Sequence, residues 1–421
     1  MKNNERSLKP VQLLTGKYGI LLLTALNVCL AVLVITLSNY WAGLDIIHSN
    51  TDFMTFFLPD YRIGFVSRAL VGSVIYLFTD HPTVHMVAVI LYITIFISGV
   101  LFCFMQALLA KKALLTRGYA TLLLSYLFFL NKVFWWNSMQ EIGMLDIFMT
   151  LLVQLFVLCI ESRRTPGFLL APLVCCIGLL IHTAFFFFGF PVAAAILWFE
   201  LLKSGRPNRT CAAAFTAACI LSVALFVLFT IFPHVFVRVT PDELQTLLKE
   251  KYSGDIQETY FSSYLFRTNS NEYSEPLEAS EFLRYVATRT DFFSPKLRRY
   301  LLNLLPLSGL FLFGCVNHMR RSGNRKIAYL GFLAPLVALF PSLYFSSDKE
   351  RFFSLCIVAQ YLLLHYISTQ TDIRFLPCAA DPPPRVLSAS EAKRRKEKID
   401  QVWIACAIAG LIFTIVGAWK L

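Results

Sequence analysis

Apolar runs long enough to cross a bilayer recur along this chain from end to end. A transmembrane helix needs about 20 predominantly apolar residues, and only 15% of the 421 residues are charged, against about 25% in ordinary soluble domains. We therefore predict an all-α fold, a polytopic membrane helix bundle of about 11 transmembrane helices. The predicted spans are 18–42, 86–109, 117–132, 144–161, 167–182, 184–201, 211–232, 299–317, 327–345, 352–369 and 401–419.

Basic residues cluster in alternate connections between these runs. Because cytoplasmic loops of membrane proteins are enriched in Lys and Arg, this alternation predicts a multi-pass membrane protein with a cytoplasmic N-terminus. It also accounts for the net charge of +12 without a nucleic-acid partner. The clusters are Lys2, Arg6, Lys9 and Lys17; Lys111, Lys112 and Arg117; Arg163 and Arg164; Lys203, Arg206 and Arg209; Arg320, Arg321, Arg325 and Lys326; and 391–398.

The segment 63–78 is apolar but contains Arg68. Counting it as a span would place the cluster at 111–117 outside and a guanidinium within hydrocarbon, which is costly. We expect an interfacial helix after the first span instead. The alternative is a twelfth span with a compensating change elsewhere.

The predicted organisation has three parts. Residues 1–232 form the first part of the membrane domain, with a first outer loop at 43–85. Residues 233–298 carry both charge signs and helix-like stretches, which predict an extracytoplasmic loop domain. Residues 299–421 form the second part of the membrane domain, with a cytoplasmic basic loop at 370–400.

With this topology, the unusual polar residues fall on the outer face, from segments distant in sequence. Ion-coupled transporters usually need ionisable groups or broken helices near the midplane, whereas an enzyme acting on a lipid-linked substrate needs its chemistry at one interface. The distribution favours the enzyme. The outer-face residues include Asp52, Asp60, Arg62, Arg68, Glu141, Asp146, His182, Asp348 and Arg351.

The layout of a long acidic first outer loop, an interfacial helix and about eleven spans resembles the GT-C superfamily of integral-membrane glycosyltransferases. That resemblance implies a polyprenyl-phosphate-linked sugar donor and a first-loop carboxylate as catalytic base. Four segments also resemble those of bacterial envelope membrane proteins whose substrates are unassigned, and this resemblance implies a location in a bacterial cytoplasmic membrane. They are DYRIGFVSRALVG, QEIGMLD, LIHTAFFFFGFP and SSDKERF.

Glycosyl transfer needs a base for the acceptor hydroxyl and cations for the departing phosphate. Asp60 is the first candidate base and Asp52 the second; the alternative for Asp60 is a turn after Pro59. The candidate phosphate-binding residues are Arg62, Arg68, His182 and Arg351.

These basic groups also have ordinary structural interpretations. Arg62 and Arg68 could contact lipid phosphates by snorkelling, and a lone His such as His182 at a helix end is often structural. Arg351 could form a surface pair with Asp348 in a tight turn.

Three further acidic residues are candidate supporting groups: Glu141, Asp146 and Asp348. Glu141 and Asp146 lie five residues apart, so they are not stacked on one helix face, and one of them is expected to stabilise a helix N-terminus. No cysteine or histidine spacing fits a metal site. We predict no cofactor and leave a divalent metal unassigned.

The sequence therefore favours a membrane glycosyltransferase that transfers a sugar from a lipid-linked donor to an envelope glycan or lipid-linked acceptor on the extracytoplasmic face. Its predicted partners are the donor, the glycan acceptor and the bilayer. The first alternative is a polysaccharide repeat-unit polymerase, because the outer segment 233–298 is rich in arginine. A flippase or other transporter of lipid-linked oligosaccharides is the alternative from a different class.

Overall fold

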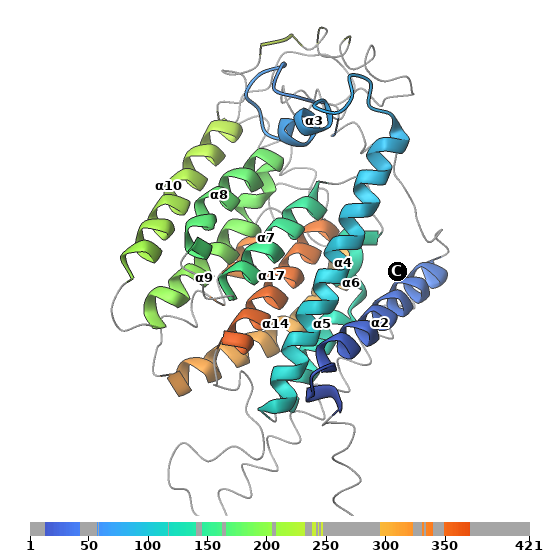
Figure 1. Cartoon of the computed structure of the whole chain (residues 1–421), viewed down its shortest axis with the longest axis vertical. Helices are drawn as coiled ribbons and strands as arrows, with labels where there is room; N and C mark the ends of the chain where they lie inside the picture. Colours follow the sequence, from blue (N-terminus) through green and yellow to red (C-terminus); the bar gives the residue numbers. More distant parts are fainter. Residues whose placement is uncertain are drawn as a thin grey trace, which may run out of the picture.

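The computed structural model is built from helices that pack side by side (Figure 1). It describes residues 13–42, 57, 59–116, 118–139, 145–161, 166–203, 208–231, 238–240, 243, 246, 295–322, 331, 334–339 and 349–370. Within these ranges there is no strand, which confirms the all-α class. The helices are α2 (Gly19–Ala42), α3 (Ala69–Ile75), α4 (Val84–Leu115), α5 (Tyr119–Phe129), α6 (Lys132–Met139), α7 (Asp146–Glu161), α8 (Pro166–Ile181), η2 (Thr183–Phe186), α9 (Gly189–Lys203), α10 (Arg209–Ile231), α14 (Pro295–Ser322) and α17 (Lys349–Gln370).

Five helical stretches are long and apolar enough to cross a membrane, by length and composition. They are Gly19–Leu37, His85–Leu115, Thr183–Leu202, Arg209–Thr230 and Arg351–Gln370. Three shorter apolar stretches accompany them, at Tyr119–Phe129, Gly167–Ile181 and Leu304–Met319. These helices support a bilayer environment, while the count of eleven spans stays a prediction.

Most predicted spans have a helical counterpart at nearly the same residues, but two short elements were not predicted. One is α6, which starts where the Asn131 side chain accepts a hydrogen bond from the Val133 amide at 2.8 Å. The other is η2, a single 3₁₀ turn between α8 and α9. The predicted span 401–419, the loop 370–400 from residue 371 onward, and most of 233–298 and 327–345 lie outside the described residues.

The helix α3 is too short to cross a bilayer, because its seven residues extend only about 10 Å. The segment 63–78 therefore does not form the twelfth span that was considered as an alternative. It lies at one end of the bundle, against the end of α8 (Figure 1). The Ser67 hydroxyl donates to the Leu179 carbonyl at 3.1 Å and the Arg68 amide to the Leu180 carbonyl at 2.9 Å. These bonds satisfy carbonyl groups of the last turn of α8.

Backbone contacts hold the segment around α3 in place. A Cβ atom on Gly72 would lie 1.9 Å from the Pro59 carbonyl oxygen, so only glycine permits this approach. The Arg238 amide donates to the Ile63 carbonyl at 2.8 Å. Arg238, near the start of the predicted loop domain at 233–298, thus contacts the predicted first outer loop.

The helix α17 forms the centre of the bundle and contacts α4, α5, α6, α7, α9 and α14 (Figure 1). Polar side chains join it to its neighbours: Tyr361 donates to Gln106 at 3.1 Å, and Gln360 donates to Ser308 at 2.6 Å. Interhelical hydrogen bonds of this kind stabilise helix association where no water is available.

The helices α7 and α17 run in the same direction. At their first turns Asp146 pairs with Arg351, and near their last turns Glu161 contacts His365 and Thr369. Two helices joined in this order at both ends must be parallel. This arrangement brings the first residue of α7 beside the start of α17, and it positions the candidate site described next.

Candidate functional site

Four polar side chains from four separate segments meet at the end of the bundle near α3. They are Arg68, Asp146, His182 and Arg351, each at most 6% exposed, and we call them the buried charge cluster. Three of them were predicted as phosphate-binding residues and Asp146 as a supporting residue. Charges are expensive to bury and are usually retained for pairing or function. The convergence of these four predicted residues makes the cluster the candidate functional site.

The ion pair between Asp146 and Arg351 is bidentate. Arg351 Nε donates to one carboxylate oxygen of Asp146, and Nη2 donates to the other at 2.6 Å. Asp146 is the first residue of α7, where a negative charge also interacts favourably with the helix dipole. Arg351 is therefore buried and not part of an exposed turn, and Asp348, the partner considered above, lies outside the described residues.

His182 connects the two arginines. Its Nε2 lies 2.6 Å from Arg68 Nη2 and 3.0 Å from Arg351 Nη2. Its Nδ1 accepts the backbone N–H of Ala184 at 2.8 Å and so caps the turn η2. Nδ1 thus has the structural role of capping η2, while Nε2 faces the two arginines and is the nitrogen to which the predicted phosphate-binding role would apply.

Two glycines fix the turn that carries His182. The ring of Phe185 fills the space where a Cβ on Gly178 would lie 2.3 Å away and a Cβ on Gly189 2.2 Å away. A side chain at either position would displace the ring. The close approach of Phe185 to α8 and α9 therefore holds η2, and with it His182, against the bundle.

Arg68 has an unusual backbone conformation. It precedes α3 with φ 74° and ψ −8°, and it is the one non-glycine residue with positive φ among the described residues. Such a conformation costs on the order of 1 kcal/mol or more and persists only when the surroundings impose it. The hydrogen bond from its amide to α8 is one such constraint. Strain of this kind concentrates at functional sites.

Asp60 and Arg62 lie on the same segment, just before α3. The buried Asp60 carboxylate accepts the Arg62 amide at 2.8 Å and Arg62 Nε at 2.7 Å. The guanidinium stacks on the Tyr76 ring, 4.6 Å from its centroid. The hydrogen bond to Asp60 raises the pKa of Arg62, and burial, followed by the charge of Asp60, raises the pKa of Tyr76 to about 12.

Asp60 therefore does shape the turn after Pro59, as the structural interpretation of this residue predicted. Its Oδ1 accepts a hydrogen bond from the Arg62 backbone amide and so orders the turn, and its Oδ2 accepts a hydrogen bond from the Arg62 side chain. The prediction that Asp60 is a catalytic base remains a prediction. Asp52, Glu141 and Asp348 lie outside the described residues. No group of three His, Cys, Asp or Glu side chains that could hold a metal occurs in the described part of the chain.

A second polar cluster at the opposite ends of α7 and α17 was not predicted. Thr369 donates to Glu161 at 2.5 Å, His365 Nε2 lies 2.9 Å from Glu161, and Tyr366 donates to Glu200 at 2.5 Å. Glu161 ends α7 and Glu200 lies in the last turn of α9, close to the basic connections that follow, so the sequence pattern resembled ordinary loop charges. The sequence feature that could have indicated this cluster is the presence of histidine and hydroxyl side chains within the apolar helix α17.

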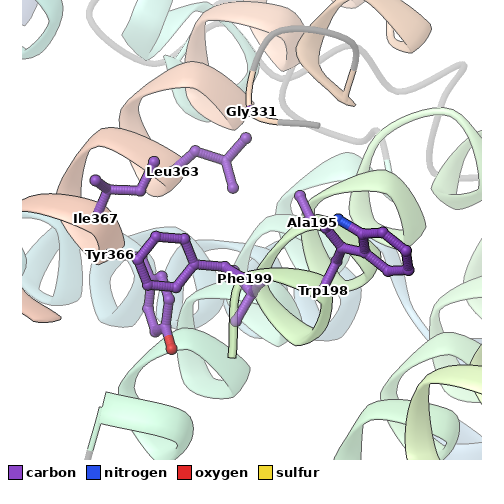
Figure 2. Close-up of a pocket in the computed structure, with 8 residues that line it drawn as sticks. Ala195, Trp198, Phe199, Gly331, Leu363, Tyr366 and Ile367 are labelled. Carbon is purple, nitrogen blue, oxygen red and sulfur yellow. The ribbon is translucent and has the colours of Figure 1, made fainter. Parts of the chain in front are cut away.

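A cavity lies beside this second cluster, between α9 and α17 (Figure 2). Its volume of about 10 Å³ is enough for roughly one water molecule, and it is lined by Ala195, Ile196, Trp198, Phe199, Gly331, Leu363, Tyr366 and Ile367. It is too small for a sugar or a lipid headgroup. The buried charge cluster, and not this cavity, is therefore the candidate functional site.

The assignment of the site depends on its own chemistry. No protein-family model matches the sequence, and no curated protein matches it. Arginine presents a planar set of donors that suits the oxygens of phosphate and carboxylate. Two guanidiniums and an imidazole at one end of an apolar helix bundle are the chemistry of a site for an anionic group.

Proposed function

We propose that this chain is a membrane glycosyltransferase that takes a sugar from a polyprenyl-phosphate-linked donor. The acceptor is an envelope glycan or a lipid-linked glycan on the extracytoplasmic face of a bacterial cytoplasmic membrane. In this proposal about eleven helices span the membrane, the N-terminus is cytoplasmic, and α3 lies at the outer interface.

The observation that carries the proposal is the meeting of Arg68, His182 and Arg351 at one end of the bundle. A departing lipid phosphate needs cationic donors that reach the level of the headgroups, and guanidinium groups bind phosphate oxygens with good geometry. Asp146 holds Arg351 in position. In the proposed reaction these groups stabilise the charge that develops on the phosphate as the glycosidic bond breaks.

Asp60 is the proposed base. It lies eight residues before Arg68 on the segment that leads into α3, and α3 contacts α8 close to His182. To take a proton from an acceptor hydroxyl, its carboxylate must have an oxygen accessible to the acceptor. Because the Arg62 guanidinium is the exposed side of this pair, with 59% of its side chain accessible, movement of Arg62 would open that access.

Replacement of Asp60 by Asn tests the proposal. Asn keeps the oxygen that accepts the Arg62 amide, so the turn is retained, but it cannot act as a base at neutral pH. We expect loss of the chain-dependent glycan from the cell envelope, measured by glycan profiling at matched expression. Asp80→Asn, an exposed carboxylate on the same connection, is the control. A normal glycan profile in Asp60→Asn would remove the base assignment.

The second polar cluster favours a second candidate, a transporter of lipid-linked oligosaccharide. Its carboxylates and imidazole lie within helices, where ion-coupled transporters place such groups. Translocation of a fluorescent lipid-linked oligosaccharide across vesicles that contain the protein distinguishes the two. Translocation without glycosyl transfer would favour the transporter.

A further inference from the structure

The second polar cluster contains a carboxylate with one basic neighbour. Glu161 is the last residue of α7, and its Oε1 accepts the Thr369 hydroxyl at 2.5 Å and lies 2.9 Å from His365 Nε2. Only 10% of the Glu161 side chain is exposed, and His365 is completely buried. Among the residues that the structure describes, His365 is the one basic side chain within ion-pair distance of this carboxylate.

His365 is not held in place as a structural histidine usually is. The 2.9 Å separation from Glu161 is that of an ion pair, but the ring is not aligned for a linear hydrogen bond. Within the described part of the chain neither ring nitrogen has a hydrogen-bond partner. His182, by contrast, caps η2 through its Nδ1. Buried polar groups are nearly always hydrogen-bonded, so an imidazole without such bonds needs another explanation.

One proton balances the charge of Glu161 and His365. An ionised Glu161 beside an imidazolium and a protonated Glu161 beside a neutral imidazole are both neutral overall, and they differ only in the position of the same proton. Loss of that proton would leave a lone buried carboxylate, and gain of a second would leave a lone imidazolium. Either charge is costly among apolar helices. The two groups therefore bind protons as a unit.

We propose that Glu161 and His365 form a proton-binding site at the end of the bundle opposite the buried charge cluster. The bound proton is carried by Glu161 or by His365 Nε2, and Thr369 holds the carboxylate beside the ring. The proton enters and leaves through the exposed part of the Glu161 side chain, where α7 ends. The site shares no residue with the buried charge cluster and does not rest on the proposed function.

The chemistry of the cluster favours a proton over a metal ion. The hydroxyls of Thr369 and Tyr366 donate to Glu161 and Glu200, so the oxygens that a metal would need face hydrogens instead. A calcium or magnesium ion requires about six or more converging oxygens. In the described part of the chain no three His, Cys, Asp or Glu side chains come together in that way.

The other ionisable groups around this half of α17 are mainly phenols and thiols, which are uncharged near neutral pH. Glu161 interacts electrostatically with Tyr361 and Tyr366, and Glu200 accepts the Tyr366 hydroxyl. In the helix α6 the ionisable residue is Lys132, at its first position. The further groups are Cys103, Lys111 and Lys112 on α4, Tyr126 on α5, Cys211 on α10, and Cys315 and His318 on α14.

Histidine nitrogen signals test the site directly. The full-length protein, labelled with ¹⁵N at its seven histidines, is purified in detergent, and two signals are assigned by their loss in His365→Gln and His318→Gln. We expect the His365 signals to respond to pH. His318 is the internal control, because it is also buried and its ring nitrogens have no hydrogen-bond partner among the described residues. Without a carboxylate its ring should stay neutral.

Replacement of Glu161 by Gln should uncouple the pair. Gln keeps an oxygen that accepts the Thr369 hydroxyl but removes the charge that balances His365. We expect the proton affinity of His365 to fall about tenfold or more, as for loss of an opposite charge at this distance. Asp80→Asn, which removes an exposed carboxylate near α3, should leave the His365 titration unchanged.

Two results would overturn the proposal: a His365 ring that does not respond to pH, and a response that is the same in Glu161→Gln. If Glu161→Gln fails to fold, Glu161→Asp replaces it, because the shorter side chain withdraws the carboxylate from the ring. A smaller loss of proton affinity is then expected, and an unchanged affinity again overturns the proposal.

A metal ion is the competing ligand, and the wild type alone tests it. Sodium, magnesium and zinc chlorides, added at constant pH and ionic strength, should leave the His365 signals unchanged. A saturable shift with one of these salts would identify a cation site and overturn the assignment to a proton.

Discussion

Arg351 and Asp146 form a bidentate ion pair across 205 residues of sequence. The pair joins the starts of the parallel helices α7 and α17 and holds the Arg351 guanidinium beside His182. Both side chains are buried, so each depends on the other to offset the loss of hydration. The pair is therefore the contact on which the geometry of the candidate site most depends.

Asp146→Asn should destabilise the protein strongly, because it leaves a buried guanidinium without its carboxylate. Breaking a buried pair in this way typically costs about 3–5 kcal/mol. The measurement is unfolding of the purified protein in detergent. Arg62→Gln should cost less, because 59% of the Arg62 side chain is exposed and the buried Asp60 carboxylate keeps its hydrogen bond from the backbone amide of residue 62. Equal stability of the two variants would contradict this account.

Gly72→Ala should also be destabilising, because its Cβ would lie 1.9 Å from the Pro59 carbonyl oxygen. Forcing backbone segments apart typically costs about 1–3 kcal/mol. Gly99→Ala is the matched control, since nothing lies within 4 Å of a Cβ at this position within α4. There alanine should stabilise the helix by up to about 1 kcal/mol. Thermal unfolding compares the two, and a stable Gly72→Ala variant would show that α3 can move away from Pro59.

Stability should fall between pH 10 and pH 12 through Tyr61 and Tyr76. Burial raises the pKa of each phenol from 10 to about 12 in the folded protein. A raised folded pKa contributes stability that is present below pH 10 and is lost as pH rises toward 12. Tyr61→Phe and Tyr76→Phe together should make this loss shallower, measured as unfolding midpoint against pH. An unchanged slope would mean that other groups dominate the alkaline transition.

Thr369→Val should destabilise the far end of α17. The change is nearly isosteric but removes the hydroxyl that donates to Glu161, so a mostly buried carboxylate loses a donor. The expected cost is about 1–3 kcal/mol. Thr24→Val is the control, because the Thr24 hydroxyl bonds only the Ile20 carbonyl in its own helix. Unfolding in detergent should rank Thr369→Val as the less stable of the two.

The helices were largely predictable because their apolar runs are long and some carry local start signals. Thr83, for example, begins α4 by accepting the Met86 amide at 3.2 Å. The helix α6 was missed because the predicted span ended at residue 132, although Asn131 is a good helix cap. A single 3₁₀ turn such as η2 has too few residues for any periodic pattern.

The candidate site was predictable as a set of residues but not as a set of contacts. Positive-inside parity put Arg68, His182 and Arg351 on one face, and the structure brings these three together. The ion pair of Arg351 with Asp146 was not predicted, because Asp348 and Glu350 are the carboxylates close to Arg351 in the sequence. Pairing with Asp146 depends on the parallel packing of α7 and α17, which no local pattern encodes.

The parallel packing of α7 and α17 has a mechanical consequence. From Arg351 to His365, α17 extends about 21 Å along its axis, and α7 holds it at both levels. If α17 slides or rotates, the contacts at both of its ends must change together. Binding of a proton or ion that alters the contacts of Glu161 would therefore also shift the Arg351 guanidinium at the other end of α17. We therefore expect a displacement of α17 at one side of the bundle to be transmitted to the other side.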